Sequence, residues 1–354
     1  MPLIFVDDDA PNDPGPNDPG ISDPLEDGSA LNPFDSIQEA INSISDSLPY
    51  VIRIRDGNYG VPSSAGLQIF TQFQQVRFAM LEGENGPENC IIDAGGADHV
   101  VSFVNPQFDL RQGIRGVTIT GATDSGVYCR DTTVSIDNCI IEGNTGADGG
   151  GIGMMDASPV ISNCDVRGNV SSRRGGGIYA LRGVPIVANC TVVENTGTTG
   201  GGIAFGSPVV FSGPPVTMIR NSTIANNTGG GIHFKTASGS SGVITASDLV
   251  VWGNTSGDQI QINTGTLQLP YANIQGGLSG ILVLANATLE TGPGFINLDP
   301  LFVDPAMGDY HLSAGSPCID AGNPNFVPLP GETDIDGEAR VQGAAVDLGS
   351  DERP

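Results

Sequence analysis

The chain has 354 residues, with 51 glycines and 25 prolines, and carries 40 acidic side chains against 14 basic ones. The resulting net charge of −26 opposes attraction to nucleic acid or to an anionic membrane surface, so neither is an expected partner. No apolar run approaches the roughly twenty residues of a membrane-spanning helix, so no membrane insertion is expected. The high glycine and proline content requires many turns, which is not typical of a helical protein.

Residues 1–48 are expected to form an irregular segment followed by a helix. The stretch from residue 6 to residue 29 is rich in Asp, Pro and Gly, which is typical either of a calcium loop or of a solvated loop without EF-hand spacing. Its candidate metal ligands are Asp7, Asp8, Asp9 and Asp27. The opening residues 1–6 have no basic stretch and no long apolar core, so no secretory signal is expected there.

Residues 32–48 predict a helix that covers the first turn of the core. Pro33 suits a first helical turn, and Ser36 with Glu39 has the spacing of a capping box. The apolar residues of one helical face are Ile37, Ala40, Ile41 and Ile44. Such a cap is needed because an uncovered sheet edge invites association with other chains.

Two sequence markers recur together in residues 49–296, with a period of 25 to 26 residues where the repeat is clearest. The first is Asn-Cys followed by a second Asn, at Asn138-Cys139 with Asn144, Asn163-Cys164 with Asn169, and Asn189-Cys190 with Asn195. The second is a glycine cluster before a β-branched residue, as at Gly151-Ile152, Gly177-Ile178 and Gly202-Ile203. Two markers in step indicate a structural repeat.

Each repeat contains three short runs of alternating polarity, such as 177–180, 185–188 and 190–193, separated by Gly, Asn or Pro. Each run is too short for a helix and predicts a strand. Because no crossover helix fits between the strands, each is expected to pair with its equivalent in the next repeat. The predicted fold is all-β, a right-handed parallel β-helix with three strands per turn.

Stacking also places the cysteines of the repeat. Cys139, Cys164 and Cys190 occupy equivalent positions just after an asparagine corner, where a buried ladder of thiols is the favoured interpretation. A disulfide between neighbouring turns is geometrically allowed but less favoured. A metal site is the weakest alternative, because no Cys-x2-Cys pair is present.

Residues 297–354 lose the repeat and are expected to form an irregular cap packed on the solenoid, which makes one domain overall. The phrases at 298–302, 309–312, 316–322 and 334–337, with those at 33–41 and 51–59, resemble secreted bacterial proteins with pectate-lyase-like β-helix repeats, common in Planctomycetes. The resemblance spans nearly the whole chain. It implies a secreted or cell-surface location and a fold shared by polysaccharide lyases, epimerases, glycosidases and adhesins.

The resemblance also implies where a ligand binds. In the enzymes that this chain resembles, sugar binds across the outer face of the first strand of each turn. Alternation puts the isoleucine after each glycine cluster inside, so every second residue lies outside. The apolar residues expected inside are Cys129, Met154, Ala180, Phe205 and Phe234. The candidate substrate-binding residues are Tyr128, Arg130, Arg173, Arg174 and Arg182, and the candidate catalytic residues are Lys235, His233 and Tyr179. Cationic and aromatic side chains on so acidic a protein indicate an acidic polysaccharide as partner.

The sharpest functional hypothesis is a polysaccharide lyase or C5-epimerase. Uronate β-elimination needs a cation for the carboxylate, a base for the neighbouring C–H and an acid for the leaving oxygen. Lys235 or His233 is the candidate base, Tyr179 the acid, and Arg182 or Arg174 the carboxylate clamp.

Two alternatives are weighed against this chemistry. In the first, the protein is a noncatalytic glycan-binding, adhesion or cell-envelope module. The outward side chains are then solvated or serve packing, and the arginines pair with acids such as Asp131 or Asp156. An inverting glycosidase ranks last, because no carboxylate pair is evident. His99 and His311 are expected to serve packing or capping, the only expected cofactor is calcium, and the protein is expected to be a monomer.

Overall fold

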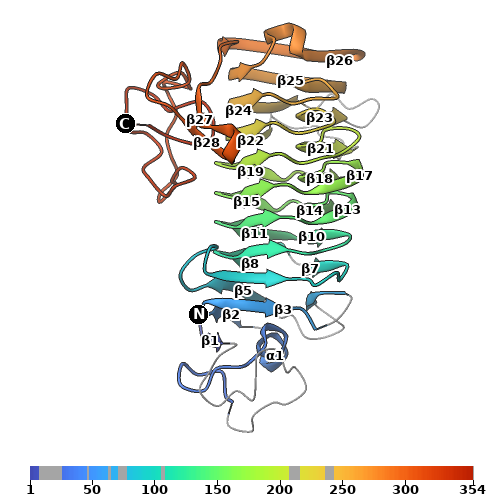
Figure 1. The fold of residues 1–354 in the computed structure, drawn as a ribbon, viewed down its shortest axis with the longest axis vertical. Helices are drawn as coiled ribbons and strands as arrows, with labels where there is room; N and C mark the ends of the chain where they lie inside the picture. The colour runs from blue at the N-terminus through green and yellow to red at the C-terminus, as the bar shows by residue number, and fades with distance from the viewer. Residues whose placement is uncertain are drawn as a thin grey trace.

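The computed structural model describes residues 1–7, 26–45, 48–62, 65–70, 78–104, 108–206, 216–235 and 243–353. Its strands stack turn upon turn along one axis into a solenoid, with helix α1 at the N-terminal end and the C-terminal segment along one flank (Figure 1). All pairings between turns are parallel, which confirms the predicted all-β parallel solenoid. None of the helices in the described residues is long and apolar enough to cross a membrane.

Most of the described strands form three walls, which we call walls 1, 2 and 3. β13 (Thr145–Asp148) and β17 (Val170–Arg174) form a separate two-stranded parallel sheet. Wall 1 contains β4 (Leu67–Phe70), β7 (His99–Val104), β10 (Ser125–Arg130), β14 (Ile152–Met155), β18 (Ile178–Leu181), β21 (Ile203–Gly206), β23 (Ile232–Lys235) and the first parts of β25 (Ile260–Ile274) and β26 (Ile281–Ile296). Wall 2 contains β1 (Leu3–Val6), β2 (Pro49–Ile54), β5 (Phe78–Gly83), β8 (Phe108–Arg115), β11 (Thr133–Asp137), β15 (Val160–Ser162), β19 (Ile186–Ala188), the first halves of β22 (Val216–Ala225) and β24 (Val243–Trp252), and the middle of β25 and β26. Wall 3 contains β3 (Gly57–Gly60), β6 (Cys90–Asp93), β9 (Thr118–Thr120), β12 (Ile140–Glu142), β16 (Asp165–Arg167), β20 (Thr191–Val193) and the ends of β22, β24, β25 and β26.

Helix α1 (Ile37–Ser43) closes the N-terminal end of the solenoid (Figure 1). Ser36 is its N-cap and accepts a hydrogen bond from the backbone N–H of Glu39, which is one of the two hydrogen bonds of a capping box. Ile37 and Ile41 are buried against the first turns. The helix is shorter than the predicted 32–48, and Pro33 lies ahead of the N-cap. Phe34 bridges to Val6, which keeps this stretch extended.

The register of wall 1 confirms the predicted inward phase. Ile152, Ile178, Ile203 and Ile232 pair in succession from turn to turn, and all are buried. The second inward column contains Cys129, Met154, Ala180, Phe205 and Phe234. Phe205 and Phe234 stack with ring centroids 5.0 Å apart. Alternate residues of these strands therefore point out of the solenoid.

Another buried column, outside wall 1, is polar. It contains Asn144, Asn169, Asn195, Asn227 and Asn254. Each Nδ2 donates to the Oδ1 of the next asparagine at 2.9–3.1 Å. Each Nδ2 also donates to a backbone carbonyl of the preceding turn, for example from Asn195 to Val166 at 2.8 Å. The ladder ends on the side-chain oxygen of Gln259, at 2.8 Å from Asn254. We call this column the asparagine ladder.

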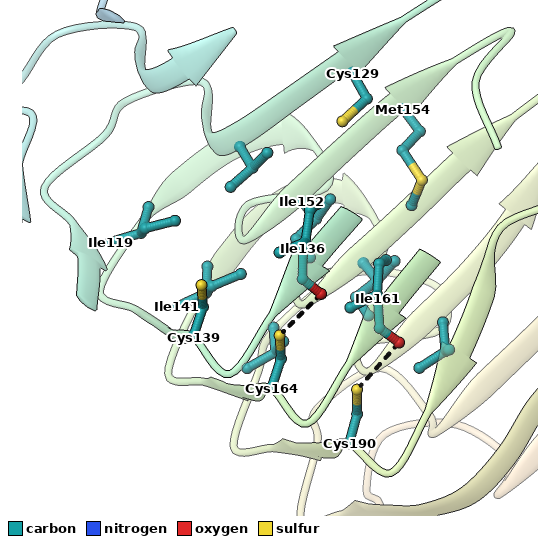
Figure 2. Packing of buried hydrophobic residues seen from close by; sticks show 14 of the residues in the cluster. Ile119, Cys129, Ile136, Cys139, Ile141, Ile152, Met154, Ile161, Cys164 and Cys190 are labelled. Carbon is teal, nitrogen blue, oxygen red and sulfur yellow. Dashed lines mark hydrogen bonds between the residues drawn. The ribbon is translucent and has the colours of Figure 1, made fainter. Parts of the chain in front are cut away.

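The cysteines of the repeat form a ladder of buried thiols, as predicted (Figure 2). Each Sγ lies within hydrogen-bonding distance of a carbonyl in the preceding turn, at 3.6 Å from Cys164 to Ile136 and from Cys190 to Ile161. The asparagines just before them, including Asn163 and Asn189, have φ of 51° and 54°. This left-handed backbone is one that asparagine tolerates better than most residues.

The C-terminal segment packs along the flank of the solenoid and leaves its last turn uncovered (Figure 1). It contains β27 (Phe302–Asp304), the 3-10 helix η2 (Pro305–Met307) and β28 (Asp309–Leu312). The hydroxyl of Tyr310 donates to Glu194 at 3.0 Å, and Ser350 hydrogen-bonds to Thr191 at 2.8 Å. The segment thus connects turns that lie well below the end of the solenoid.

Candidate functional site

Two columns of side chains point outward from wall 1. Tyr128, Gly153, Tyr179, Ala204 and His233 pair in succession in the first column. Arg130, Met155, Leu181, Gly206 and Lys235 do so in the second. Tyr179 and His233 are therefore two turns apart, about 10 Å along the axis, and Lys235 lies on the same strand as His233. The structure brings all three candidate catalytic residues to one face.

Tyr179 points outward, yet it is only 4% exposed. The guanidinium of Arg174 lies over its ring, 4.6 Å from the centroid. The hydroxyl reaches across to Gly206, where a Cβ atom would overlap it. That hydroxyl is buried and has no hydrogen-bond partner. Burial raises the pKa of Tyr179, and Arg174 offsets part of this effect, so the phenol is protonated near neutral pH.

His233 is also nearly covered, at 6% exposure, and neither ring nitrogen has a hydrogen-bond partner of good geometry. Burial is the largest effect on its pKa and lowers it. The nearby charges of Lys235 and Arg174 lower it further, while Asn263 offsets part of the change. His233 is therefore a neutral imidazole near neutral pH, with a lone pair available on one ring nitrogen.

Three unpaired polar atoms in one buried patch are costly for the protein. A buried donor or acceptor without a partner costs about 1–3 kcal/mol. Such atoms are uncommon in folded proteins and are found where strain or function requires them. We call the patch formed by Tyr179, His233, Gly206 and Lys235 the wall 1 site.

The arginines near the wall 1 site are mostly neutralised by acids. Arg173 and Arg174 both bind Asp148, the latter through contacts of 2.9 and 3.1 Å. Arg182 forms a bidentate ion pair with Asp156, at 2.8 and 2.6 Å.

Arg130 lies 3.3 Å from Asp131, so the alternative pairing of arginines with Asp131 and Asp156 is realised for Arg130 and Arg182. Lys235 is exposed and has no ion pair within the described residues. It is thus the cation of the wall 1 site that is free to meet a charged ligand.

Tyr128 lies two turns from Tyr179 in the same column, with Gly153 between them. Its ring stacks on His99, with centroids 4.9 Å apart and planes within 7°. His99 Nδ1 in turn lies 3.2 Å from the carbonyl of Ser125. The packing role expected for His99 is confirmed, and Tyr128 offers a half-buried aromatic face beyond the wall 1 site.

The acidic residues proposed for calcium do not form a ligand cluster within the described residues. Asp7 is buried and forms an ion pair with Arg55. Asp27 accepts the backbone N–H of Ser29 at 2.9 Å, which caps its own turn. Asp8 and Asp9 lie outside the described residues. The two visible carboxylates therefore do not fit a calcium site by themselves, and calcium binding at these four residues stays a prediction.

A second polar cluster lies where the C-terminal segment meets wall 3, beside a cavity of about 370 Å³ lined by Arg167 and Asp165 among others. Ligand atoms of His311, Asp336 and Asp351 lie within 4.8 Å of one another there. Burial alone would lower the pKa of His311, but hydrogen bonding to Asp309 and the charges of Asp336 and Asp351 raise it. The imidazolium is thus the natural counter-ion of this cluster. The sequence did not predict the cluster, because its members come from parts of the tail without a period.

The stacked parallel strands, inward apolar columns and left-handed asparagine corners define the chain as a parallel β-helix protein. It belongs to the right-handed β-helix family: the model of the right-handed β-helix region matches residues 42–196 and 103–274, which together cover about two-thirds of the chain. No curated protein matches the chain.

Several solved structures match the chain. Pectate lyase Pel9A is 17% identical with a TM-score of 0.53, over 100% of this chain and 97% of that one. A pectin methylesterase from carrot is 13% identical with a TM-score of 0.45, over 82% of this chain and 83% of that one. The likeness to pectate lyase Pel9A, at 17% identity, shows a common fold alone.

Proposed function

We propose that the protein acts outside the cell on an acidic polysaccharide, which binds across wall 1 and reacts at the wall 1 site. The observation that carries this proposal is the set of buried, unpaired polar atoms on Tyr179 and His233. A ligand with hydroxyl and carboxylate groups would supply the missing partners. The resemblance to polysaccharide-acting β-helix proteins supports the class of ligand.

In the proposed reaction the chain uses one cation, one base and one acid. Lys235 pairs with the uronate carboxylate, which makes the neighbouring C–H more acidic. Neutral His233 accepts the proton from that carbon, and the electron pair left behind forms the C=C bond as the glycosidic C–O bond breaks. Tyr179 donates its proton to the leaving oxygen.

The lean of Tyr179 brings its hydroxyl closer to the other two residues. Its ring starts two turns from His233, but the hydroxyl lies over Gly206, which pairs directly with Lys235. The remaining separation along the axis is therefore about one turn, roughly 5 Å. The hydroxyl and both ring nitrogens of His233 are covered, so a sugar residue would contact all three side chains only after the Tyr179 ring lifts away from Gly206.

The test is a turnover assay on polygalacturonate, alginate and sulfated glycans, with and without calcium, followed by the ultraviolet absorbance of unsaturated uronate ends. His233→Ala and Tyr179→Phe are each expected to lower kcat by about 10²–10⁴-fold. Lys235→Ala is expected to reduce kcat/KM strongly. The matched control is Arg115→Ala, which removes one cation from an ion pair with Glu82 on wall 2 and should leave turnover unchanged.

Full lyase activity in the His233→Ala and Lys235→Ala variants would contradict the assigned roles. C5-epimerase chemistry uses the same proton removal without breakage of the glycosidic bond. It would appear as solvent deuterium at C5 by NMR, with no new unsaturated ends.

A noncatalytic glycan-binding or cell-envelope role is the second candidate, favoured by the pairing of Arg173, Arg174 and Arg182 with Asp148 and Asp156. These pairs leave Lys235 to attract an anionic chain. In that case the glycan would be retained on an affinity gel by the native protein, less by Lys235→Ala, and no unsaturated ends or deuterium exchange would form.

A further inference from the structure

The two ends of the solenoid are finished differently. At the N-terminal end, α1 buries Ile37 and Ile41 against the first turns. At the other end, β26 pairs only with β25 among the described strands, so its second edge has unpaired backbone groups. An unpaired strand edge is a template for pairing with another chain.

The side chains of this open end are apolar and exposed. Leu282, Val283 and Leu284 are 38–39% exposed, and Leu278 in the adjacent 3-10 helix η1 (Gly277–Gly280) is 62% exposed. Val283 belongs to an inward column, since it pairs with the buried Ile262. It is exposed because no further turn covers it. Water therefore reaches the end of the hydrophobic core.

The charge of the end differs from that of the rest of the chain. Within residues 281–296 the only charged side chain is Glu290, although the whole chain has a net charge of −26. Two copies of so acidic a protein repel each other over most of their surfaces. The open end is where that repulsion is weakest, which favours a second copy of this chain as the occupant.

The capped N-terminal end determines how two copies can meet. Head-to-tail stacking would require the open end of one copy to displace α1 of the next, so a continuous fibre is disfavoured. Two open ends facing each other form a closed, two-fold contact in which strands of the two copies run antiparallel. β26 passes through all three walls, so its 16 residues outline the end turn and do not form one straight edge. Two facing copies can pair along one wall, and the wall 1 part, with the exposed Leu282 and Val283, offers the apolar contact.

We propose that the protein forms a two-fold dimer through its C-terminal end, with β26 of each copy pairing edge to edge. A monomer is expected from the sequence. The open end follows from the position of the C-terminal segment on the flank, which the sequence does not predict. Pairing along one wall makes a small interface, so the dimer is expected to depend on protein concentration.

Sedimentation velocity on the full chain tests the proposal. The native protein is expected to shift from monomer to dimer between about 1 and 100 µM. Val283→Lys places a charge in the contact and should leave the protein monomeric throughout this range. Val327→Lys is the matched control, because Val327 is 81% exposed and lies between Asn323 and Glu332, which contact Asp248 of β24 and Arg220 of β22 and not the end turn. It should dimerise like the native protein.

Hydrogen exchange gives a second measurement that does not depend on a variant. The backbone amides of residues 281–290 should become more protected as the protein concentration rises, while those of β1 and α1 should not change. A native protein that stays monomeric, a dimer that survives Val283→Lys, or open-ended polymers would each overturn the proposal.

Discussion

The protein has two sets of buried polar side chains: the asparagine ladder inside the solenoid and the wall 1 site on its outer face. They differ in whether their polar atoms have hydrogen-bond partners. Every asparagine of the ladder donates to a side chain and to a backbone carbonyl, and its oxygen accepts from the preceding turn. Tyr179 and His233 are also buried, but their polar atoms lack hydrogen-bond partners of good geometry. The comparison separates polar groups that hold the fold together from polar groups that the fold does not need.

The largest expected effect comes from a break in the ladder. Asn195→Ala removes the acceptor of Asn169 and the donor to Asn227 and Val166, so several buried groups lose a partner at once. We expect a loss of about 3 kcal/mol or more in the free energy of unfolding. Urea unfolding measures it, with the exposed Asn85→Ala as control. Equal stability of the two variants would contradict the structural role of the ladder.

The next effect concerns the space over Gly206. Gly206→Ala places a methyl group where the Tyr179 hydroxyl lies, so the ring must move at a cost of about 1–3 kcal/mol. The same substitution in a Tyr179→Ala background should cost much less, since the obstacle is gone. A double-mutant cycle by thermal unfolding measures this coupling. Additive effects would show that the two residues do not touch.

Removal of the unpaired hydroxyl itself should not destabilise the protein. Tyr179→Phe keeps the ring under Arg174 and deletes a buried group without a partner, so the free energy of unfolding should stay the same or rise by about 1 kcal/mol. Glycan turnover or binding should nevertheless fall. A large loss of stability in this variant would assign the hydroxyl to the fold rather than to the site.

The smallest effects are those of pH on two histidines with opposite surroundings. The lowered pKa of His233 means that its contribution to stability is present above about pH 6.5 and is lost as the pH falls toward the folded-state pKa. The raised pKa of His311 has the opposite effect. The contribution of His311 to stability is fully present below about pH 6.5 and is lost as the pH rises through the folded-state pKa.

Melting curves from about pH 5 to 8 should therefore respond in opposite directions to the two substitutions. His233→Gln should raise Tm relative to the native protein at the acid end by about 2 °C. His311→Gln should lower Tm most at that same end. Parallel shifts in the two variants would refute the opposite pKa directions.

Much of the fold could be predicted because it repeats. The period locates the inward isoleucines, the asparagine corners and the thiol ladder, and it aligns Tyr179, His233 and Lys235 on one face. The ion pair of Arg182 with Asp156 also follows from the period, since the two residues are 26 positions apart. Asp148 and Arg174 have the same separation, so the period alone would also have located that pair.

Other features could not be predicted, because they depend on contacts without a period. The burial of Tyr179 and His233 depends on side chains leaning between turns, which alternation of polarity does not describe. The cluster of His311, Asp336 and Asp351 joins distant parts of an irregular segment. The position of that segment on the flank, which leaves β26 open, likewise depends on single contacts such as Glu332 with Arg220.

The flank position of the C-terminal segment has a consequence for the order of assembly. In a solenoid each turn contacts only its neighbours, so stacking can proceed as the chain leaves the ribosome. The hydrogen bonds of Ser350 to Thr191 and of Asn189 to Glu332, however, join residues 159 and 143 positions apart. These contacts can form only after the last part of the chain has been synthesised. The C-terminal segment therefore fixes in place turns that have already stacked.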